Sequence, residues 1–194
     1  EIWLSRAYNK WMQEKMLSAD ARIKFLAVLP FNTPEECERI VQETAGKRGI
    51  VGFAIPSTRH APVHHNKYMR LYRLIEETGM PVSFHAGYHW DDPSLKTVNR
   101  FLGMHALGFA WPNIVHCTNW VLNGIPARFP KLKVIWIESG LAWVPFVMQR
   151  LDDQFLMRPS EAPQLKRLPS EYMRDHCWYT TQPMETTNVK ALEC

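Results

Sequence analysis

The sequence predicts an α/β fold built on a parallel sheet, and three observations support this. Short apolar runs alternate with amphipathic segments along the whole chain. The short runs are apolar throughout, as is typical of strands in sheets that are covered on both faces. Proline or glycine follows several of these runs and separates strand from helix. Repeated strand–helix units of this kind form parallel sheets with right-handed crossovers.

Five runs are predicted strands, because each is short, apolar and bounded by turn signals or by a predicted helix. They cover residues 23–29, 50–55, 82–85, 134–137 and 177–181. Pro30 and Pro56 follow the first two runs directly, and Ala86-Gly87 follows the third.

The segments between the strands have apolar residues at helical spacing. The predicted helices cover residues 2–19, 34–45, 66–77, 94–123 with a break near Trp111, 124–130, 142–155, 169–176 and 188 onward. Thr33-Pro34 followed by two acids indicates a helix start, Asn66 is a candidate cap, and Gly79 indicates a stop. Residues 59–65 and 156–168 are predicted loops.

Composition and charge exclude several classes of protein. The 194 residues suit one domain, and the values of 46% hydrophobic and 22% charged residues are globular. The net charge of +4 is spread over helices, which argues against a nucleic-acid partner. No apolar run approaches the roughly 18 residues of a membrane span. The four cysteines form no CxxC pair, so reduced thiols and a cytoplasmic location are expected.

Two architectures fit this pattern, an open doubly wound sheet and a barrel. No GxGxxG or P-loop motif follows any predicted strand, so the sequence does not support a nucleotide-binding sheet. Five strands are also too few to close a (β/α)8 barrel, which usually needs about 250 residues.

Glu138 is the most informative single residue, because it directly follows the apolar run 134–137. A carboxylate at the exit of a buried strand is costly unless another group pairs with it. Parallel α/β proteins also place their chemistry at these strand ends. The alternative is that Glu138 caps the helix that follows within a few residues.

The run 123–152, NGIPARFPKLKVIWIESGLAWVPFVMQRLD, resembles the amidohydrolase-2 family of metal-dependent TIM-barrel hydrolases and decarboxylases. The segment 79–87, GMPVSFHAG, looks like the fifth barrel strand of that family, and 169–185 looks like the seventh strand with its preceding helix. The resemblance implies an incomplete (β/α)8 barrel, roughly strands three to seven, in one domain over residues 1–194 that lacks the family's first and last strands.

The resemblance also implies roles for individual residues. His85 matches the strand-end metal ligand, although such a histidine can instead bond a backbone carbonyl. Glu138 is expected to position a ligand, contact the metal or transfer a proton. His116 is a further catalytic candidate on a helix, with an ordinary core or surface histidine as the alternative. Four residues are candidates for a substrate pocket, although aromatic residues also fill large cores: Tyr88, His89, Trp90 and Trp111.

The implied activity is metal-dependent hydrolysis or non-oxidative decarboxylation of a small carboxylated substrate, aromatic or cyclic. The implied cofactor is a divalent metal, zinc before manganese. A catalytic zinc needs about three protein ligands, and His85 is the one clear candidate, so a tight site in this chain alone is in question. The competing expectation is a catalytically incomplete barrel fragment that self-associates as a homo-oligomer or acts as a binding protein. Neither expectation includes a membrane.

Overall fold

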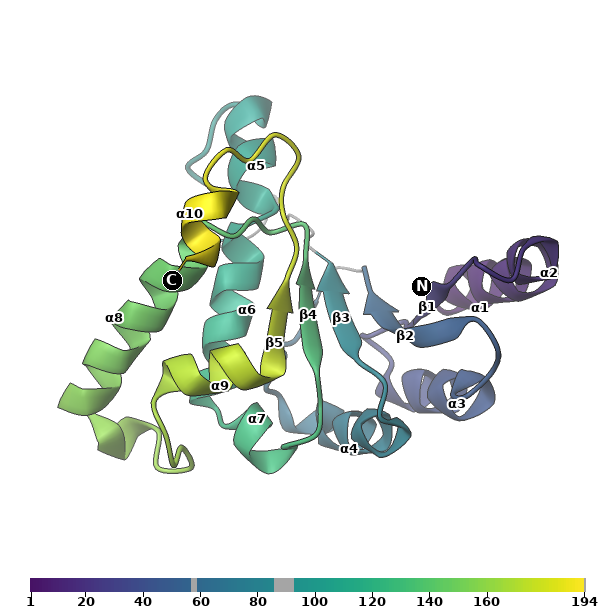
Figure 1. Cartoon of the computed structure of the whole chain (residues 1–194), viewed down its shortest axis with the longest axis horizontal. Helices are drawn as coiled ribbons and strands as arrows, with labels where there is room; N and C mark the ends of the chain where they lie inside the picture. Colours follow the sequence, from purple (N-terminus) through teal and green to yellow (C-terminus); the bar gives the residue numbers. More distant parts are fainter. Residues whose placement is uncertain (57–58, 86–92, 194) are drawn as a thin grey trace.

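The computed structural model describes residues 1–56, 59–85 and 93–193, and in them five parallel strands form one sheet (Figure 1). The strands are β1 (Phe25–Val28), β2 (Ile50–Ile55), β3 (Val82–His85), β4 (Val134–Ile137) and β5 (Cys177–Tyr179). All five predicted strands are confirmed, and the first and last are shorter than the apolar runs that predicted them.

Most predicted helices are present as well. They are α1 (Ile2–Trp11), continued by a π-helical turn (Met12–Met16) and α2 (Leu17–Ala19), then α3 (Pro34–Thr44), α4 (Met69–Thr78), α5 (Phe101–Gly108), α6 (Trp111–Leu122), α7 (Ile125–Arg128), α8 (Trp143–Met157), α9 (Pro169–His176) and α10 (Asn188–Leu192). None of the described helices has the length and apolar character needed to cross a membrane.

Three local predictions were wrong. Asn66 is not a cap, because it lies inside a short 3-10 helix (Asn66–Tyr68), and Nδ1 of His65 accepts the N–H of Lys67 instead. Residues 94–100 are not helical, so the helix begins only at Phe101. The predicted loop after residue 155 is shorter than expected, because α8 continues to Met157 and a 3-10 helix (Pro159–Glu161) follows.

The order of the strands decides between the two architectures. In the described sheet the order is β1-β2-β3-β4-β5, so each strand pairs with its neighbour in the sequence. A doubly wound sheet instead reverses its order at a switch point, where its ligands bind. Sequential parallel order is that of a barrel wall, and the sheet is therefore part of a TIM barrel.

One face of the sheet carries an aromatic core. Phe84 on β3 stacks on Trp136 of β4 at 5.2 Å between ring centroids, and Trp120 of α6 meets both rings edge-on. Tyr72 of α4 contacts Trp120 at 5.0 Å. All four aromatic side chains are fully buried, and they pack helices α4 and α6 against this face of the sheet.

The opposite face is less buried than the sequence suggested. Its aliphatic side chains are only partly buried in the described residues, and Trp178 of β5 is 44% exposed. These side chains include Leu26, Val28, Ala54, Ile135 and Ile137. Apolar strands predicted a sheet covered on both faces, but within the described chain helices bury most of one face and leave the other partly open.

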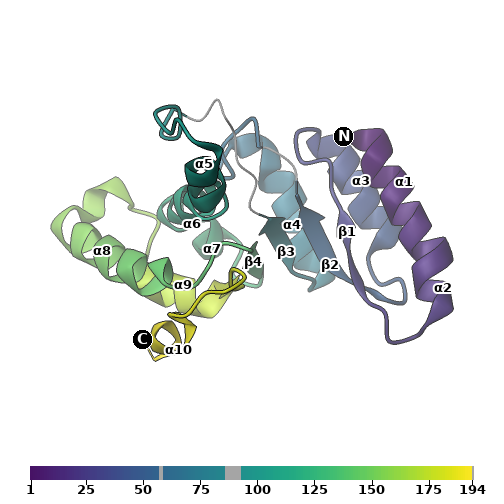
Figure 2. The same cartoon turned by 90° about the horizontal axis from the view of Figure 1, so that it is seen from above.

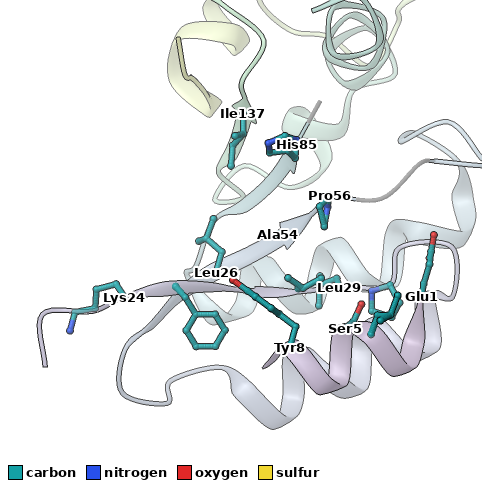
Figure 3. Close-up of a pocket in the computed structure, with 14 residues that line it drawn as sticks. Glu1, Ser5, Tyr8, Lys24, Leu26, Leu29, Ala54, Pro56, His85 and Ile137 are labelled. Carbon is teal, nitrogen blue, oxygen red and sulfur yellow. The ribbon is translucent and has the colours of Figure 1, made fainter. Parts of the chain in front are cut away.

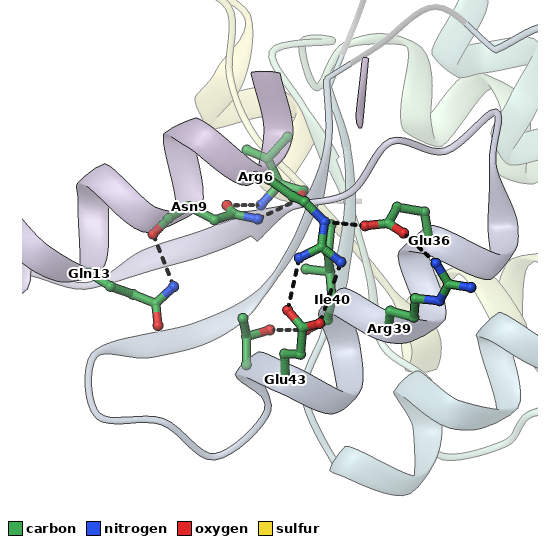
Figure 4. A network of polar contacts seen from close by, with 9 residues as sticks. Arg6, Asn9, Gln13, Glu36, Arg39, Ile40 and Glu43 are labelled. Atoms are coloured by element: carbon green, nitrogen blue, oxygen red, sulfur yellow. Dashed lines mark hydrogen bonds and ion pairs between the residues drawn. The ribbon is translucent and has the colours of Figure 1, made fainter. Parts of the chain in front are cut away.

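Helix α1 lies at the β1 end of the molecule, opposite α8 (Figure 2). The side-chain amide of Asn9 bonds both backbone groups of Val28, accepting its N–H at 2.8 Å and donating to its C=O at 2.9 Å. Arg6 of the same helix pairs with Glu36 and Glu43 of α3 (Figure 4). The amide of Asn9 thus satisfies backbone groups at the outer edge of β1 that a further strand would otherwise bond.

Candidate functional site

His85 and Glu138 meet at the end of the sheet. His85 is the last residue of β3 and pairs in register with Ile137, the last residue of β4, so Glu138 directly follows the residue opposite His85. Nε2 of His85 is 2.9 Å from Oε2 of Glu138, a hydrogen-bonding distance. The two side chains are 35% and 36% exposed, so solvent reaches both partners. The register of two parallel strands has brought together the two strand-end groups that the sequence singled out.

The backbone of Glu138 is in the left-handed region, with φ of 55°. This conformation costs a residue with a side chain about 1–2 kcal/mol, so neighbouring groups must hold it. The N–H of Glu138 donates to Oγ1 of Thr180 at 2.7 Å, and its C=O accepts from Nε2 of Gln182 at 2.6 Å. The segment that follows β5 therefore binds both backbone groups of Glu138.

Glu138 does not cap the helix that follows it. The N–H groups of Leu141 and Ala142, just before α8, donate to Oε1 of Glu185 at 2.8 and 3.0 Å. Oε2 of Glu185 also accepts the N–H of Gln182 at 3.2 Å. The capping role considered for Glu138 thus belongs to a carboxylate of the C-terminal segment, and the side chain of Glu138 is directed to His85.

A buried polar network lies behind the pair. Arg59 is 8% exposed, and both of its terminal nitrogens donate to the backbone C=O of His85, at 3.1 and 3.2 Å. Nη2 also donates to Oδ1 of Asn113 at 3.1 Å. The amide nitrogen of Asn113 is 2.6 Å from Oγ of Ser139. Burial lowers the pKa of the Arg59 guanidinium to about 10, so it remains a cation at neutral pH.

A cavity of about 730 Å³ opens on the partly buried face of the sheet (Figure 3). His85 and Ile137 line it from the strand ends, together with Leu26, Val28 and Ala54. Leu4, Ser5 and Tyr8 of helix α1 line another side, together with Glu1 just before this helix. The remaining lining residues are Lys24, Phe25, Leu29, Pro30 and Pro56. The wall is mainly apolar, so the cavity suits a small ligand with an apolar body and few polar groups.

The described residues provide only part of a metal site. Imidazole nitrogen and carboxylate oxygen are both ligands for zinc and manganese. However, the described residues contain no group of three or more His, Cys, Asp or Glu that could hold a metal ion. Two donors are one fewer than a catalytic zinc usually has, so His85 and Glu138 do not complete such a site by themselves.

The remaining predicted residues have different positions. Tyr88, His89 and Trp90 lie outside the described residues. Trp111 begins α6, is 41% exposed and donates from Nε1 to Oγ of Ser94 at 2.6 Å. His116 lies on α6 one turn after Asn113, and it is Asn113 that contacts the strand ends. Roles for Trp111 and His116 stay predictions.

The sequence analysis missed Arg59, Asn113, Thr180 and Gln182. Arg59 was placed in a loop, where a cation is ordinarily solvated. One feature of the sequence could have indicated Asn113: it is a polar residue that lies among apolar residues after the break in a predicted helix. The other two contribute through contacts with a backbone far away in sequence, which no local pattern reveals.

Comparisons with known proteins agree with this architecture. The amidohydrolase-2 family model matches residues 4–192. The structure is similar to 5-carboxyvanillate decarboxylase from Sphingomonas paucimobilis, with a TM-score of 0.84 and 24% identity over 99% of this chain and 57% of that chain. It is also similar to 2,6-dihydroxybenzoate decarboxylase from Rhizobium, with a TM-score of 0.81 and 20% identity over 99% and 62% of the two chains.

A third similar structure is dihydroxybenzoic acid decarboxylase from Polaromonas sp. JS666 with bound manganese and the inhibitor 2-nitroresorcinol. Its TM-score is 0.81, with 20% identity over 99% of this chain and 61% of that chain. At these identities the likeness establishes the fold. The chain spans about three fifths of the length of these three structures. A comparison with curated proteins found no match.

Proposed function

Since the chain belongs to the amidohydrolase-2 family, we propose that it contributes to the non-oxidative decarboxylation of a small aromatic carboxylate. The observation that carries this proposal is the 2.9 Å contact of Glu138 with His85, which lines a mainly apolar cavity. The similar structures favour decarboxylation over hydrolysis, because three of them are decarboxylases of aromatic acids. The apolar wall fits an aromatic ring, and the His85–Glu138 pair fits its polar substituents.

Decarboxylation requires that the ring carbon that loses the carboxylate takes up a proton. When the bond between the ring and its carboxylate breaks, CO2 leaves and the electron pair stays on the ring carbon, which then takes up a proton. A donor must therefore stand within hydrogen-bond reach of that carbon. We assign this role to Glu138, whose carboxyl group contacts His85 of the cavity lining and whose backbone N–H and C=O are both hydrogen-bonded.

A divalent metal is part of the proposal, with His85 as one ligand. The manganese bound in the Polaromonas structure supports manganese as this ion, ahead of the zinc that the sequence suggested first. A bound divalent ion would supply positive charge that polarises the substrate. In the described structure Nε2 of His85 faces Glu138 instead. A single ring nitrogen cannot share a proton and bind a metal at the same time. Metal binding at Nε2 is therefore expected to displace the hydrogen bond to Glu138.

The test is CO2 release from 2,6-dihydroxybenzoate and from 5-carboxyvanillate, with Mn²⁺ or Zn²⁺ added to the purified chain. Turnover is expected to fall about 10²–10⁴-fold in Glu138→Gln, the usual contribution of a general acid. A comparable loss is expected in His85→Asn. Glu77→Gln and His60→Asn change exposed residues away from the pair and should keep parental activity. A folded chain that releases no CO2 with either metal contradicts the proposal.

A second candidate follows from the open face of the sheet: self-association of the barrel domain formed by residues 1–194. Trp178 is 44% exposed on this face, and Leu4 at the cavity is 77% exposed. Monomeric proteins rarely leave large apolar patches uncovered, which supports a second copy of the chain as the partner. Light scattering during size-exclusion chromatography decides the question. A monomer across the micromolar range contradicts self-association.

A further inference from the structure

Arg59 is a buried cation that has no carboxylate partner among the described residues. Within the described parts of the chain its hydrogen bonds go to neutral oxygens, the C=O of His85 and Oδ1 of Asn113. Its Cζ atom also lies 5.6 Å from the ring centroid of Phe84. Burying an unpaired charge costs several kcal/mol in proteins, so a neutral side chain would fill this space at lower cost. The planar fork of the guanidinium is the property that a neutral side chain lacks.

The fork reaches the backbone of His85 itself. Both terminal nitrogens of Arg59 donate to the same acceptor, the backbone carbonyl oxygen of His85. Two donors on one acceptor restrict the orientation of that peptide group more than a single donor does. The backbone at the end of β3 is therefore fixed at the residue whose side chain contacts Glu138.

Asn113 extends the network to the next strand. Its amide nitrogen is 2.6 Å from Oγ of Ser139, 3.3 Å from the C=O of Phe84 and 3.4 Å from the C=O of Ile137. Ser139 in turn donates from Oγ to the C=O of Ile137 at 3.2 Å. The contacts of Asn113 thus fall on the residues immediately before and after Glu138. The buried side-chain amide of Asn113 therefore contacts the ends of both β3 and β4, next to His85 and Glu138.

We propose that Arg59 and Asn113 are positioning residues that hold His85 and Glu138 at their contact distance. This role rests on the proposed function of the pair. Neither residue lines the cavity next to His85, so both act through the groups they orient. Residues that orient a functional group in this way typically change affinity or activity by about 10–100-fold when they are substituted.

Two substitutions separate positioning from simple core packing. Asn113→Asp keeps an acceptor for Arg59 and gives that cation a charged partner, but it removes the N–H donors that reach Ser139 and the strand ends. Arg59→Lys keeps the charge but replaces the fork by a single ammonium group. If the network only filled the core, Asn113→Asp would leave the pair unchanged. If it positions the pair, Asn113→Asp loosens the contact although Arg59 gains a counter-charge.

The readout is the ¹⁵N resonance of the His85 imidazole in the metal-free, substrate-free chain, assigned by its loss in His85→Asn. Glu138→Gln is expected to shift this resonance in the parent chain, because it alters the partner of Nε2. In the Asn113→Asp and Arg59→Lys backgrounds the shift caused by Glu138→Gln is expected to fall by at least half. Asn123→Asp and Arg73→Lys, at exposed positions of the same residue types, should preserve the full shift.

Retention of the full shift in folded Asn113→Asp and Arg59→Lys overturns the proposal, as does a parent chain in which Glu138→Gln has no effect on His85. If Arg59→Lys fails to fold, Asn113→Asp decides alone. Unfolding of both variants also overturns the proposal, because the network would then be a requirement of the core. Absence of CO2 release would refute the proposed function but not this role, since the resonance is measured without substrate or metal.

Discussion

Oγ1 of Thr180 accepts the backbone N–H of Glu138 at 2.7 Å and connects the end of β5 to the end of β4. The contact holds a glutamate in a backbone conformation that residues with side chains seldom adopt. With the bond from Gln182 to the C=O of the same residue, it accounts for both backbone groups of Glu138. The geometry of the pair thus depends on a segment that precedes α10.

Thr180→Val should weaken this support without changing the size of the side chain. We expect a loss of about 1–2 kcal/mol in the free energy of unfolding, because a backbone N–H loses its partner in a partly buried place. Urea unfolding measures the change. Thr33→Val is the matched control, since the side chain of Thr33 makes no capping hydrogen bond at the start of α3, and its change should stay near 0.5 kcal/mol or less. Equal effects in the two variants would argue against the role of Thr180.

The left-handed backbone at residue 138 predicts an inverted preference between glycine and alanine. Glu138→Gly should be more stable than Glu138→Ala by about 1 kcal/mol, because glycine adopts positive φ without steric cost. At the exposed helical position Glu77 the order should reverse, with alanine more stable by about 1 kcal/mol. Thermal or urea unfolding of the four variants checks this. The same order at both positions would contradict a positive φ at residue 138.

Asn9 is expected to stabilise the chain through the outer edge of β1. Asn9→Ala removes both bonds to Val28 and leaves two backbone groups without their partner. We expect a loss of about 1–3 kcal/mol in unfolding free energy and faster hydrogen exchange of the Val28 amide. Asn123→Ala, which removes an exposed side-chain bond to Asn119 at the end of α6, serves as the control. Unchanged exchange at Val28 would show that Asn9 does not protect this edge.

Stability should fall in mildly acidic solution because of His176. Burial lowers the pKa of His176 below its ordinary value of 6.5. Below pH 6.5 the unfolded chain therefore binds a proton that the folded chain still resists, so unfolding becomes easier as pH falls through this range. His176→Gln should reduce the difference in unfolding free energy between pH 7.5 and 5.5. The exposed substitution His60→Gln should leave that difference as in the parent, and an undiminished difference in His176→Gln would contradict the assignment.

Local pattern was sufficient for most of the secondary structure. The run IVGFAI and the run VIWI became β2 and β4 with the predicted bounds, because an apolar stretch between turn signals has few other stable solutions. Gly79 ends α4 with φ of 70°, as its position at the helix stop predicted. The predictions that failed concern ends and caps, such as Asn66, where one neighbouring side chain replaces another at little cost.

The candidate site was predictable in part. His85 and Glu138 could be singled out because polar groups at the ends of apolar strands are rare and costly. Their contact could not be read from the sequence, because it depends on the register between β3 and β4. Arg59 looked like a loop residue, and its burial becomes evident only when the ends of β2, β3 and α6 are assembled around it.

The sequence by itself determined the strand and helix segments, the parallel α/β class and the two strand-end residues, because these follow from local hydrophobic pattern and chain stereochemistry. The local pattern left an open sheet and a barrel as alternatives, and the sequential strand order confirmed the barrel that the family resemblance implied. Tertiary structure alone decided that Glu185 and not Glu138 accepts the N–H groups just before α8, and that Arg59 and Asn113 lie behind the pair. The physical reason is that register and burial are set by long-range contacts, whose partners a local pattern does not specify.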